Sequence, residues 1–158
     1  MTSAIVKKYD FTGKVALITG SSSGIGAAIA LQFAQYGARV TITGLETEDL
    51  EKVGKEIENK SGHCPLKIQG NLTDESFVVK LIEKTIEEYG QLNFLVNCAG
   101  VATLDKGHES DNLMAEFDRI FAINVRAAVQ LIQLAVPYLE KTKGNIINIS
   151  SIASLVPV

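Results

Sequence analysis

The segment Gly13–Phe33, which reads GKVALITGSSSGIGAAIALQF, runs an apolar strand pattern into a glycine and serine loop and then into an apolar helix pattern. A parallel strand followed by such a turn leaves free backbone N–H groups at the start of the helix. The helix macrodipole adds a partial positive charge at the same place. This segment therefore constrains the chain most, because it predicts a strand–turn–helix unit with an anion site that suits a pyrophosphate.

The loop itself has the residue types that a phosphate site needs. Gly20 permits a sharp turn, while Gly24 and Gly26 have no side chain to keep a phosphate from the backbone or the helix from the sheet. Hydroxyl donors come from the three serines between them: Ser21, Ser22 and Ser23. The spacing is G-x-x-x-G-x-G without a lysine, which argues against a Walker-type nucleotide triphosphatase. A tight turn that binds no ligand is the alternative.

Strand patterns and helix patterns alternate along the rest of the chain. The expected strands are Val15–Thr19, Val40–Thr43, Leu66–Gln69, Leu92–Asn97 and Gly144–Ser151. The expected helices are Gly24–Tyr36, Glu46–Lys60, a segment capped by Thr73 or Asp74 that runs to Tyr89, and Leu113–Glu140. This order predicts an α/β fold with a doubly wound, Rossmann-like parallel sheet, truncated after about the fifth strand. We expect residues 1–12 to form an N-terminal arm and residues 13–158 to form one dinucleotide-binding domain, incomplete at its C-terminus.

Composition argues against several classes of function. The 158-residue chain has a net charge of −3 and a pI near 5.4, whereas nucleic-acid binding needs a basic face. The N-terminus lacks the apolar core of a signal peptide, and no apolar run approaches the roughly 18 residues of a membrane span. Cys64 and Cys98 lie far apart without CxxC spacing, which favours the cytoplasm. His63 and His108 lack metal-ligand spacing, so we expect no metal site.

Small polar residues follow the predicted strands where the strands end. The second strand ends in TGLE, the third in GNLTD, the fourth in NCAG and the fifth in NISS. In a doubly wound sheet these endings meet at one edge, where ligands bind. Glu46 lies about 20 residues after the glycine loop, where an acid binds the ribose of a dinucleotide, or else it simply begins its helix. The row of endings predicts a ligand groove.

Four motifs, in their order and approximate spacing, resemble the short-chain dehydrogenase/reductase family. They are TGSSSGIG at Thr19–Gly26, NCAG at Asn97–Gly100, INV at Ile123–Val125 and GNIINISS at Gly144–Ser151. The resemblance covers the chain from about Phe11 onward. It implies NAD(P) as cofactor and hydride transfer between an alcohol and a ketone or aldehyde. The implied partners are a small carbonyl or alcohol substrate and, for the full-length form, further copies in a homo-oligomer.

The resemblance also assigns cofactor contacts residue by residue. The pyrophosphate loop would comprise Gly20, Ser22, Ser23, Gly24, Ile25 and Gly26. The adenosine would lie beside Leu45, Asn71 and Leu72, and the nicotinamide with its ribose beside Asn97, Ala99, Gly100 and Ser150. Two positions depart from the family's usual residues: Asn71 replaces an Asp, and Cys98 replaces a second Asn.

For catalysis, the resemblance implies that Ser151 polarises the substrate carbonyl and that Asn124 organises a water relay. The family's proton donor is a Tyr four residues before a Lys. None of the tyrosines has that lysine: Tyr9, Tyr36, Tyr89 and Tyr138. We therefore expect the chain as given to be a partial or truncated sequence that is inactive alone, with a bare edge on its fifth strand.

Cofactor choice and the class of function stay open in the sequence. The turn TITG at Thr41–Gly44 resembles that of NADP-type members and favours NADP over NAD, but Leu45 stands where NADP use calls for an arginine. Besides an oxidoreductase, the alternatives are a non-catalytic NAD(P)-binding isoform or regulatory module, and a different doubly wound domain such as a nucleotide-dependent transferase or a flavin protein.

Overall fold

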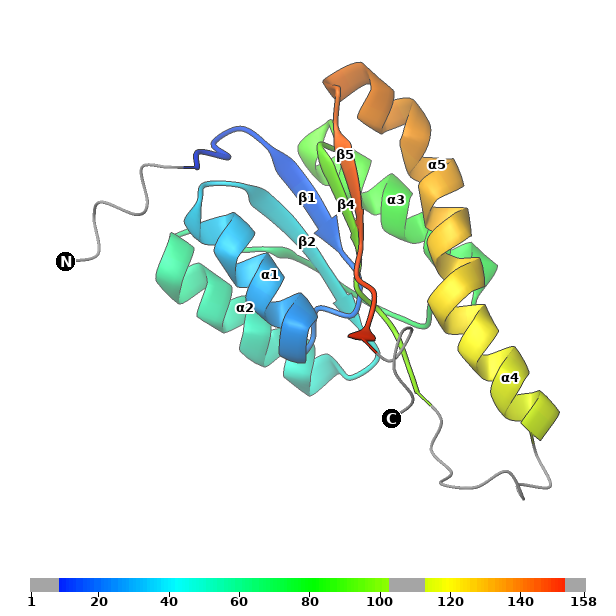
Figure 1. The fold of residues 1–158 in the computed structure, drawn as a ribbon. Helices are drawn as coiled ribbons and strands as arrows, with labels where there is room; N and C mark the ends of the chain where they lie inside the picture. The colour runs from blue at the N-terminus through cyan, green and yellow to red at the C-terminus, as the bar shows by residue number, and fades with distance from the viewer. Residues whose placement is uncertain (1–8, 103–112, 153–158) are drawn as a thin grey trace.

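The computed structural model describes residues 9–102 and 113–152 as a parallel sheet of five strands between two layers of helices (Figure 1). The strand order is β3-β2-β1-β4-β5. The strands are β1 (Val15–Ile18), β2 (Arg39–Gly44), β3 (Leu66–Gln69), β4 (Phe94–Asn97) and β5 (Asn145–Asn148). The helices are α1 (Gly24–Gln35), α2 (Thr47–Ser61), α3 (Glu75–Tyr89), α4 (Leu113–Phe121), the π-helical turn η2 (Ala122–Arg126) and α5 (Ala127–Thr142). This confirms the predicted doubly wound α/β fold.

Strand β1 lies at the centre of the sheet and fixes where the strand order reverses. Leu17 pairs with Thr41 of β2 on one side and with Leu95 of β4 on the other. From β1 the chain builds outward through β2 to β3, and then crosses back to β4 and β5. In such sheets the crevice outside the carboxyl ends of the strands, at the point of reversal, is the usual ligand site.

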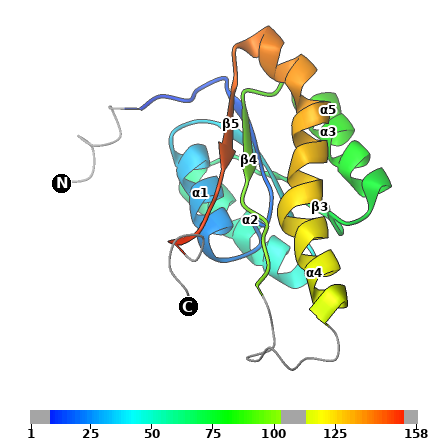
Figure 2. The ribbon, with the colours of Figure 1, turned by 45° about the vertical axis from the view of Figure 1, so that its right-hand side comes forward.

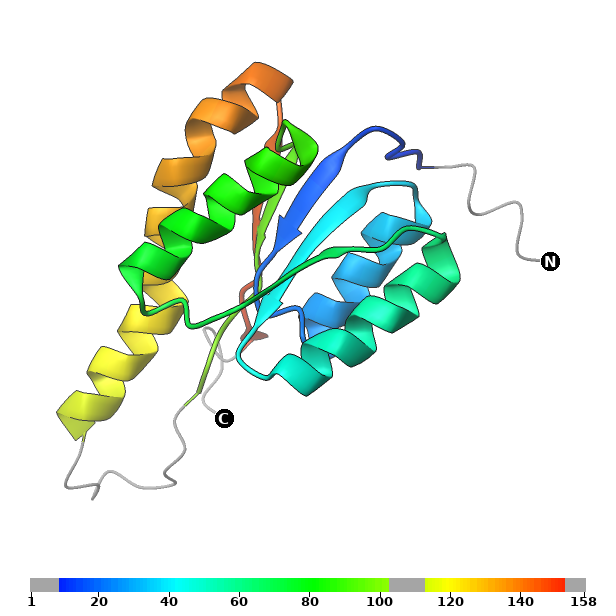
Figure 3. The ribbon, with the colours of Figure 1, turned by 180° about the vertical axis from the view of Figure 1, so that it is seen from behind.

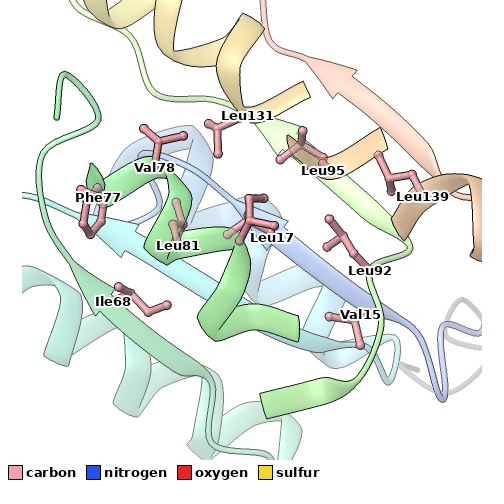
Figure 4. Close-up of a cluster of buried hydrophobic side chains, with 12 residues drawn as sticks. Val15, Leu17, Ile68, Phe77, Val78, Leu81, Leu92, Leu95, Leu131 and Leu139 are labelled. Carbon is pink, nitrogen blue, oxygen red and sulfur yellow. The ribbon is translucent and has the colours of Figure 1, made fainter. Parts of the chain in front are cut away.

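Two hydrophobic clusters, one on each face, hold the helices to the sheet. Helices α1 and α2 cover one face, and α3 and α5 cover the other (Figure 3). On the α3–α5 face, Leu17 packs with Leu81, Leu95 and Leu131 (Figure 4). Ile18, the next residue of β1, points to the opposite cluster. Because β1 is buried on both faces, its continuous apolar sequence is that of a central parallel strand.

The sequence predicts one uninterrupted helix over Leu113–Glu140, but the structure interrupts it. The turn Ala122–Arg126 is π-helical and separates α4 from α5. Such turns insert one extra residue and are frequent at functional sites. Below this turn, α5 packs on the sheet through Ala127, Leu131, Ala135 and Leu139. Helix α4 begins beyond the carboxyl ends of the strands and approaches the sheet toward η2 (Figure 2).

By length and composition, the 30 residues Leu113–Thr142 are long and apolar enough to cross a membrane, the one such helix in the described part of the chain. This differs from the expectation that no run has that length. Within the most apolar window of that helix, 17% is buried in the fold. Since one face of α5 packs against the sheet, the helix has a structural role in this domain.

Part of the segment predicted as an arm packs on the domain. Phe11 lies 5.1 Å from Phe33 and 5.2 Å from Phe94, measured between ring centroids. Its N–H donates to the carbonyl of Tyr36, which ends α1. The boundary at residue 13 stays a prediction, because residues 1–8 lie outside the described residues.

Strand β5 has one hydrogen-bonded neighbour, β4, among the described strands. Asn145, Ile147 and Asn148 are exposed, and Ile146 is half-buried. The expected bare edge is therefore present in the described structure. Unpaired backbone groups on such an edge favour pairing with another strand.

The hydroxyl of Tyr89 joins two strands, and its removal tests this part of the fold. It accepts a hydrogen bond from the N–H of Leu66 and donates one to the carbonyl of Val40. Because Tyr89→Phe leaves both backbone groups without this partner, we expect it to lower the free energy of unfolding by about 2 kcal/mol in a urea titration. The control Tyr138→Phe, on a ring that also packs partly buried against the core, removes a hydroxyl for which the described residues show no hydrogen bond, and it should change stability little. Equal effects of the two substitutions would contradict the assigned role.

Candidate functional site

A cleft of about 330 Å³ opens at the carboxyl edge of the sheet. Its walls come from the turn after β1, the ends of β2, β3 and β4, and the π-turn η2. The residues that line it are Gly20, Ser22, Ser23, Thr43, Gly44, Leu45, Glu46, Asp49, Gly70, Asn71, Leu72, Cys98, Ala99, Gly100, Val101 and Ile123. The predicted endings of the second, third and fourth strands therefore meet in one groove, whereas the fifth ending, NISS, does not line it.

Glycines at the turn after β1 allow backbone to approach backbone. A Cβ on Gly26 would lie 2.3 Å from the carbonyl oxygen of Gly20, and a Cβ on Gly20 would lie 2.7 Å from Cα of Ala99. Gly20 also has a φ of +61°, in the left-handed region. Helix α1 thus begins close above the sheet only because these positions lack side chains.

The first turn of α1 offers its backbone donors to a ligand. Its N-cap residue, Ser23, is extended and makes no side-chain capping bond. No acidic residue lies in the first turn. An N-terminus that is not capped from within the chain, beside a cleft and free of negative charge, is suited to a phosphate group.

The three serines of the loop do not play equal parts. Ser21 is buried, and its hydroxyl donates to the carbonyl of Ile18 and accepts from the N–H of Thr43, at 2.7 and 2.9 Å. The expectation that Ser21 offers its hydroxyl to a ligand is therefore wrong, because that hydroxyl joins the ends of β1 and β2. Ser22 and Ser23 line the cleft.

The opposite wall, where β4 ends, is held by the hydroxyl of Thr19. This buried oxygen accepts hydrogen bonds from the N–H groups of Cys98 and Ala99, each at 3.1 Å. The sequence assigned Thr19 no role, since a threonine that ends a strand gives no sign of which amides it will meet. Its effect is to fix the small residues after β4 against the glycine turn.

Asn124 holds the next residues of the same wall. Its side-chain amide donates to the carbonyl of Val101 and accepts from the N–H of Val101, at 2.9 and 2.8 Å. Arg119, one helical turn earlier, donates to the carbonyl of Ala102 and pairs with Glu116, which raises the pKa of the guanidinium. The π-turn is thus tied to the segment that leaves β4, and Ile123 from this turn lines the cleft.

Asn97 and the two serines after β5 lie at the same edge without lining the cleft. Asn97 is buried and donates from Nδ2 to Oδ1 of Asn148 at 2.8 Å. Its own Oδ1 is buried with no hydrogen-bond partner among the described residues. Ser150 and Ser151 are exposed and follow Ile149, whose N–H donates to the carbonyl of Asn97.

The structure brings together part of the predicted site. The predicted residues that line the cleft are Gly20, Ser22, Ser23, Leu45, Asn71, Leu72, Ala99 and Gly100. Those that do not line it are Gly24, Ile25, Gly26, Asn97, Asn124, Ser150 and Ser151. Three lining residues that sequence reasoning did not single out are Thr43, Asp49 and Val101. The sequence does show that α2 begins with acidic residues, among them Asp49. Acidic residues are common in the first turn of a helix, where they stabilise it, so this pattern alone does not indicate a binding site.

Two side chains at the cleft have restricted chemistry. Burial raises the pKa of the Cys98 thiol, so this residue is protonated at neutral pH and suited to packing. The Oδ1 atom of Asn71 accepts a hydrogen bond from the N–H of Thr73 at 3.0 Å, which stabilises the turn toward α3. No cluster of metal-ligating side chains occurs within residues 9–102 and 113–152. His63 is exposed, and His108 lies outside the described residues.

A family model described as short chain dehydrogenase matches residues 14–158. The chain belongs to the short-chain dehydrogenase family. The chain is 36% identical over 147 residues to the 3-oxoacyl-(acyl-carrier-protein) reductase of Thermotoga maritima, and 39% identical over 144 residues to the fatty acyl-CoA reductase of Acinetobacter baylyi. Both alignments cover 90% of the chain.

A solved metagenomic short-chain oxidoreductase in complex with NADP has the same fold as this chain. Its TM-score is 0.85 at 34% identity, over 94% of this chain and 66% of the other. The chain spans 57% and 48% of the lengths of the two curated relatives.

Alanine substitutions at Gly24 and Gly26 test how tightly the glycine turn is packed. Gly26→Ala should lower the free energy of unfolding by about 3 kcal/mol, because the new Cβ meets the Gly20 carbonyl. Gly24→Ala places its Cβ in open space at a φ of +53° and should cost about 1 kcal/mol of conformational strain. Urea unfolding measures both. A larger loss for Gly24→Ala would show that the turn is looser than described.

Proposed function

We propose that this chain is the cofactor-binding part of an NAD(P)-dependent oxidoreductase that transfers hydride between an alcohol and a ketone or aldehyde. The observation that carries the proposal is the uncapped start of α1 beside a cleft, with Gly20 and Gly26 at positions that no larger residue can occupy. The bound nicotinamide supplies or accepts the hydride. Membership of the family and the NADP complex of one relative support the same cofactor class.

The cofactor contacts that the family resemblance implies are part of the proposal. We propose that the amides of Gly24, Ile25 and Gly26, with the hydroxyls of Ser22 and Ser23, hold the pyrophosphate. Leu45, Asn71 and Leu72 would hold the adenosine at the ends of β2 and β3. Asn97, Ala99, Gly100 and Ser150 would surround the nicotinamide and its ribose where β4 and β5 end.

The proposed chemistry needs a donor at the carbonyl oxygen. A carbonyl that accepts hydride develops alkoxide charge, which a hydroxyl stabilises. We propose Ser151 as that donor, since it follows β5 at the carboxyl edge of the sheet. Asn124 would support a water relay, and its two bonds to Val101 also make it a residue that positions the cleft wall.

Nucleotide binding is the first test, with a matched pair of glycine variants. We expect the chain as given to enhance NADH or NADPH fluorescence on titration. Gly20→Ala should weaken binding at least about tenfold, because its Cβ displaces Ala99 from the cleft wall. Gly62→Ala carries the same backbone strain at a φ of +76°, ends α2 away from the cleft, and should bind as the wild type does. A folded chain that binds neither nucleotide would overturn the proposed function.

Catalysis is the second test, because no tyrosine in the sequence has a lysine four residues later. We propose that the chain as given binds the cofactor and shows no carbonyl-dependent oxidation of NADH or NADPH. A chain extended past Val158 with Tyr-x-x-x-Lys near positions 164 and 168 should be active, and Ser151→Ala in it should lower kcat by about 10²-fold. Without such a pair in the extended frame, a non-catalytic NAD(P)-binding isoform or regulatory module becomes the better description.

We further propose a homo-oligomeric full-length enzyme of the cytoplasm. Its support is a row of exposed apolar side chains along α4, η2 and α5: Leu113, Phe117, Phe121, Val125 and Val129. Rows of this kind on a surface helix mark protein contacts more often than solvent contacts. Both cysteines are free thiols, as a reducing compartment permits.

A further inference from the structure

The end of the cleft nearest β2 carries negative charge that the proposed function does not use. Glu46 and Asp49, from the start of α2, both line the cleft. No lysine or arginine is among the described residues that line it. Thr43, which lines the cleft on the same side, is 1% exposed, and its hydroxyl has no hydrogen-bond partner in the described structure.

The cations near this end are already held by carboxylates. Lys52 lies 3.0 Å from Asp49 and has a side chain that is 72% exposed. Lys67 lies 2.7 Å from Glu51. Glu46 makes no side-chain bond to cap its helix. A phosphate placed at this end of the cleft would therefore face the carboxylates of Glu46 and Asp49, and no lysine or arginine among the described residues lines the cleft to bind it.

The end of β2 is the ordinary position for an acidic residue that selects NAD over NADP, but here it has no room for a side chain. A Cβ on Gly44 would lie 2.3 Å from Oγ of Ser22, so a side chain at Gly44 would displace that serine. Leu45 follows, with its carbonyl bound by Nε2 of Gln69 at 2.9 Å. Because the strand end offers no charge, the carboxylates of the cleft come from the helix that begins after it.

The 2′ position of the adenosine ribose lies toward the end of β2 in doubly wound dinucleotide sites. There, a free 2′-hydroxyl can donate to a carboxylate, whereas a 2′-phosphate carries about two negative charges at pH 7. We propose, on the basis of the proposed function, that Glu46 and Asp49 make this cleft prefer NAD(H) to NADP(H). This differs from the preference for NADP that the TITG turn suggests, because that prediction did not include Asp49.

The test compares dissociation constants for NADH and NADPH, measured by nucleotide fluorescence and by calorimetry. We expect the wild type to bind NADH more tightly. Glu46→Gln should shift the ratio of the two constants toward NADPH by about fivefold. The matched control is Glu48→Gln, which removes the same charge from the same helical turn but does not line the cleft, and it should leave the ratio within about twofold.

Two further variants separate repulsion from new attraction. Asp49→Asn should shift the ratio in the same direction, but it also releases Lys52, so it is repeated together with Lys52→Gln. If the ratio of the two dissociation constants also shifts in the double variant, the shift is caused by loss of the Asp49 carboxylate and not by release of Lys52. Leu45→Arg, which adds a cation at the cleft, should raise NADPH affinity further. In the wild type, raising the salt from about 10 mM to about 1 M should narrow the difference between the nucleotides.

The outcomes distinguish this inference from the function on which it rests. Failure to bind either nucleotide overturns the proposed function. Binding of both with equal constants, tighter binding of NADPH, or equal effects of Glu46→Gln and Glu48→Gln overturns the inference and leaves the proposed function intact. A ratio that shifts with Glu46→Gln alone, and that salt reduces, supports it.

Discussion

The close approach of α1 to the turn that precedes it is the contact on which the rest of this structure depends. Position 26 must lack a side chain because a Cβ would lie 2.3 Å from the Gly20 carbonyl oxygen. With that contact, the helix begins directly at the carboxyl edge of β1, the central strand. Its N-terminus then lies beside the cleft onto which β2, β3 and β4 also open, and Ser22 and Ser23, directly before the helix, line that cleft.

The opposite wall depends on two side chains that bind backbone rather than ligand. Thr19 holds the amides of Cys98 and Ala99, and Asn124 holds both polar backbone groups of Val101. Fixed backbone keeps the cleft open without large side chains. It also leaves Glu46 and Asp49 as the charged side chains that line the cleft among the described residues, and they come from a different element than the glycine turn.

Local chemistry explains which features were predictable from sequence. The glycine turn, the five strands and the end of α3 at Tyr89 depend on neighbours in the chain, and the structure confirms them. The burial of Ser21 depends on how β1 meets β2, which no local pattern encodes. The approach of Asp49 to the cleft depends on the direction in which α2 leaves β2. These two features needed the assembled sheet.

The π-turn was also beyond prediction, because its apolar spacing fits a continuous helix. Its geometry has a consequence for the row Leu113, Phe117, Phe121, Val125 and Val129. In a regular α-helix, residues four apart drift by about 40° around the axis, so a row of five would wind almost to the far side. A turn with an extra residue winds more slowly and takes back part of that drift. The extra residue of the π-turn, located where Asn124 binds Val101, thus reduces the angle between the apolar side chains of α4 and those of α5 around the helix axis.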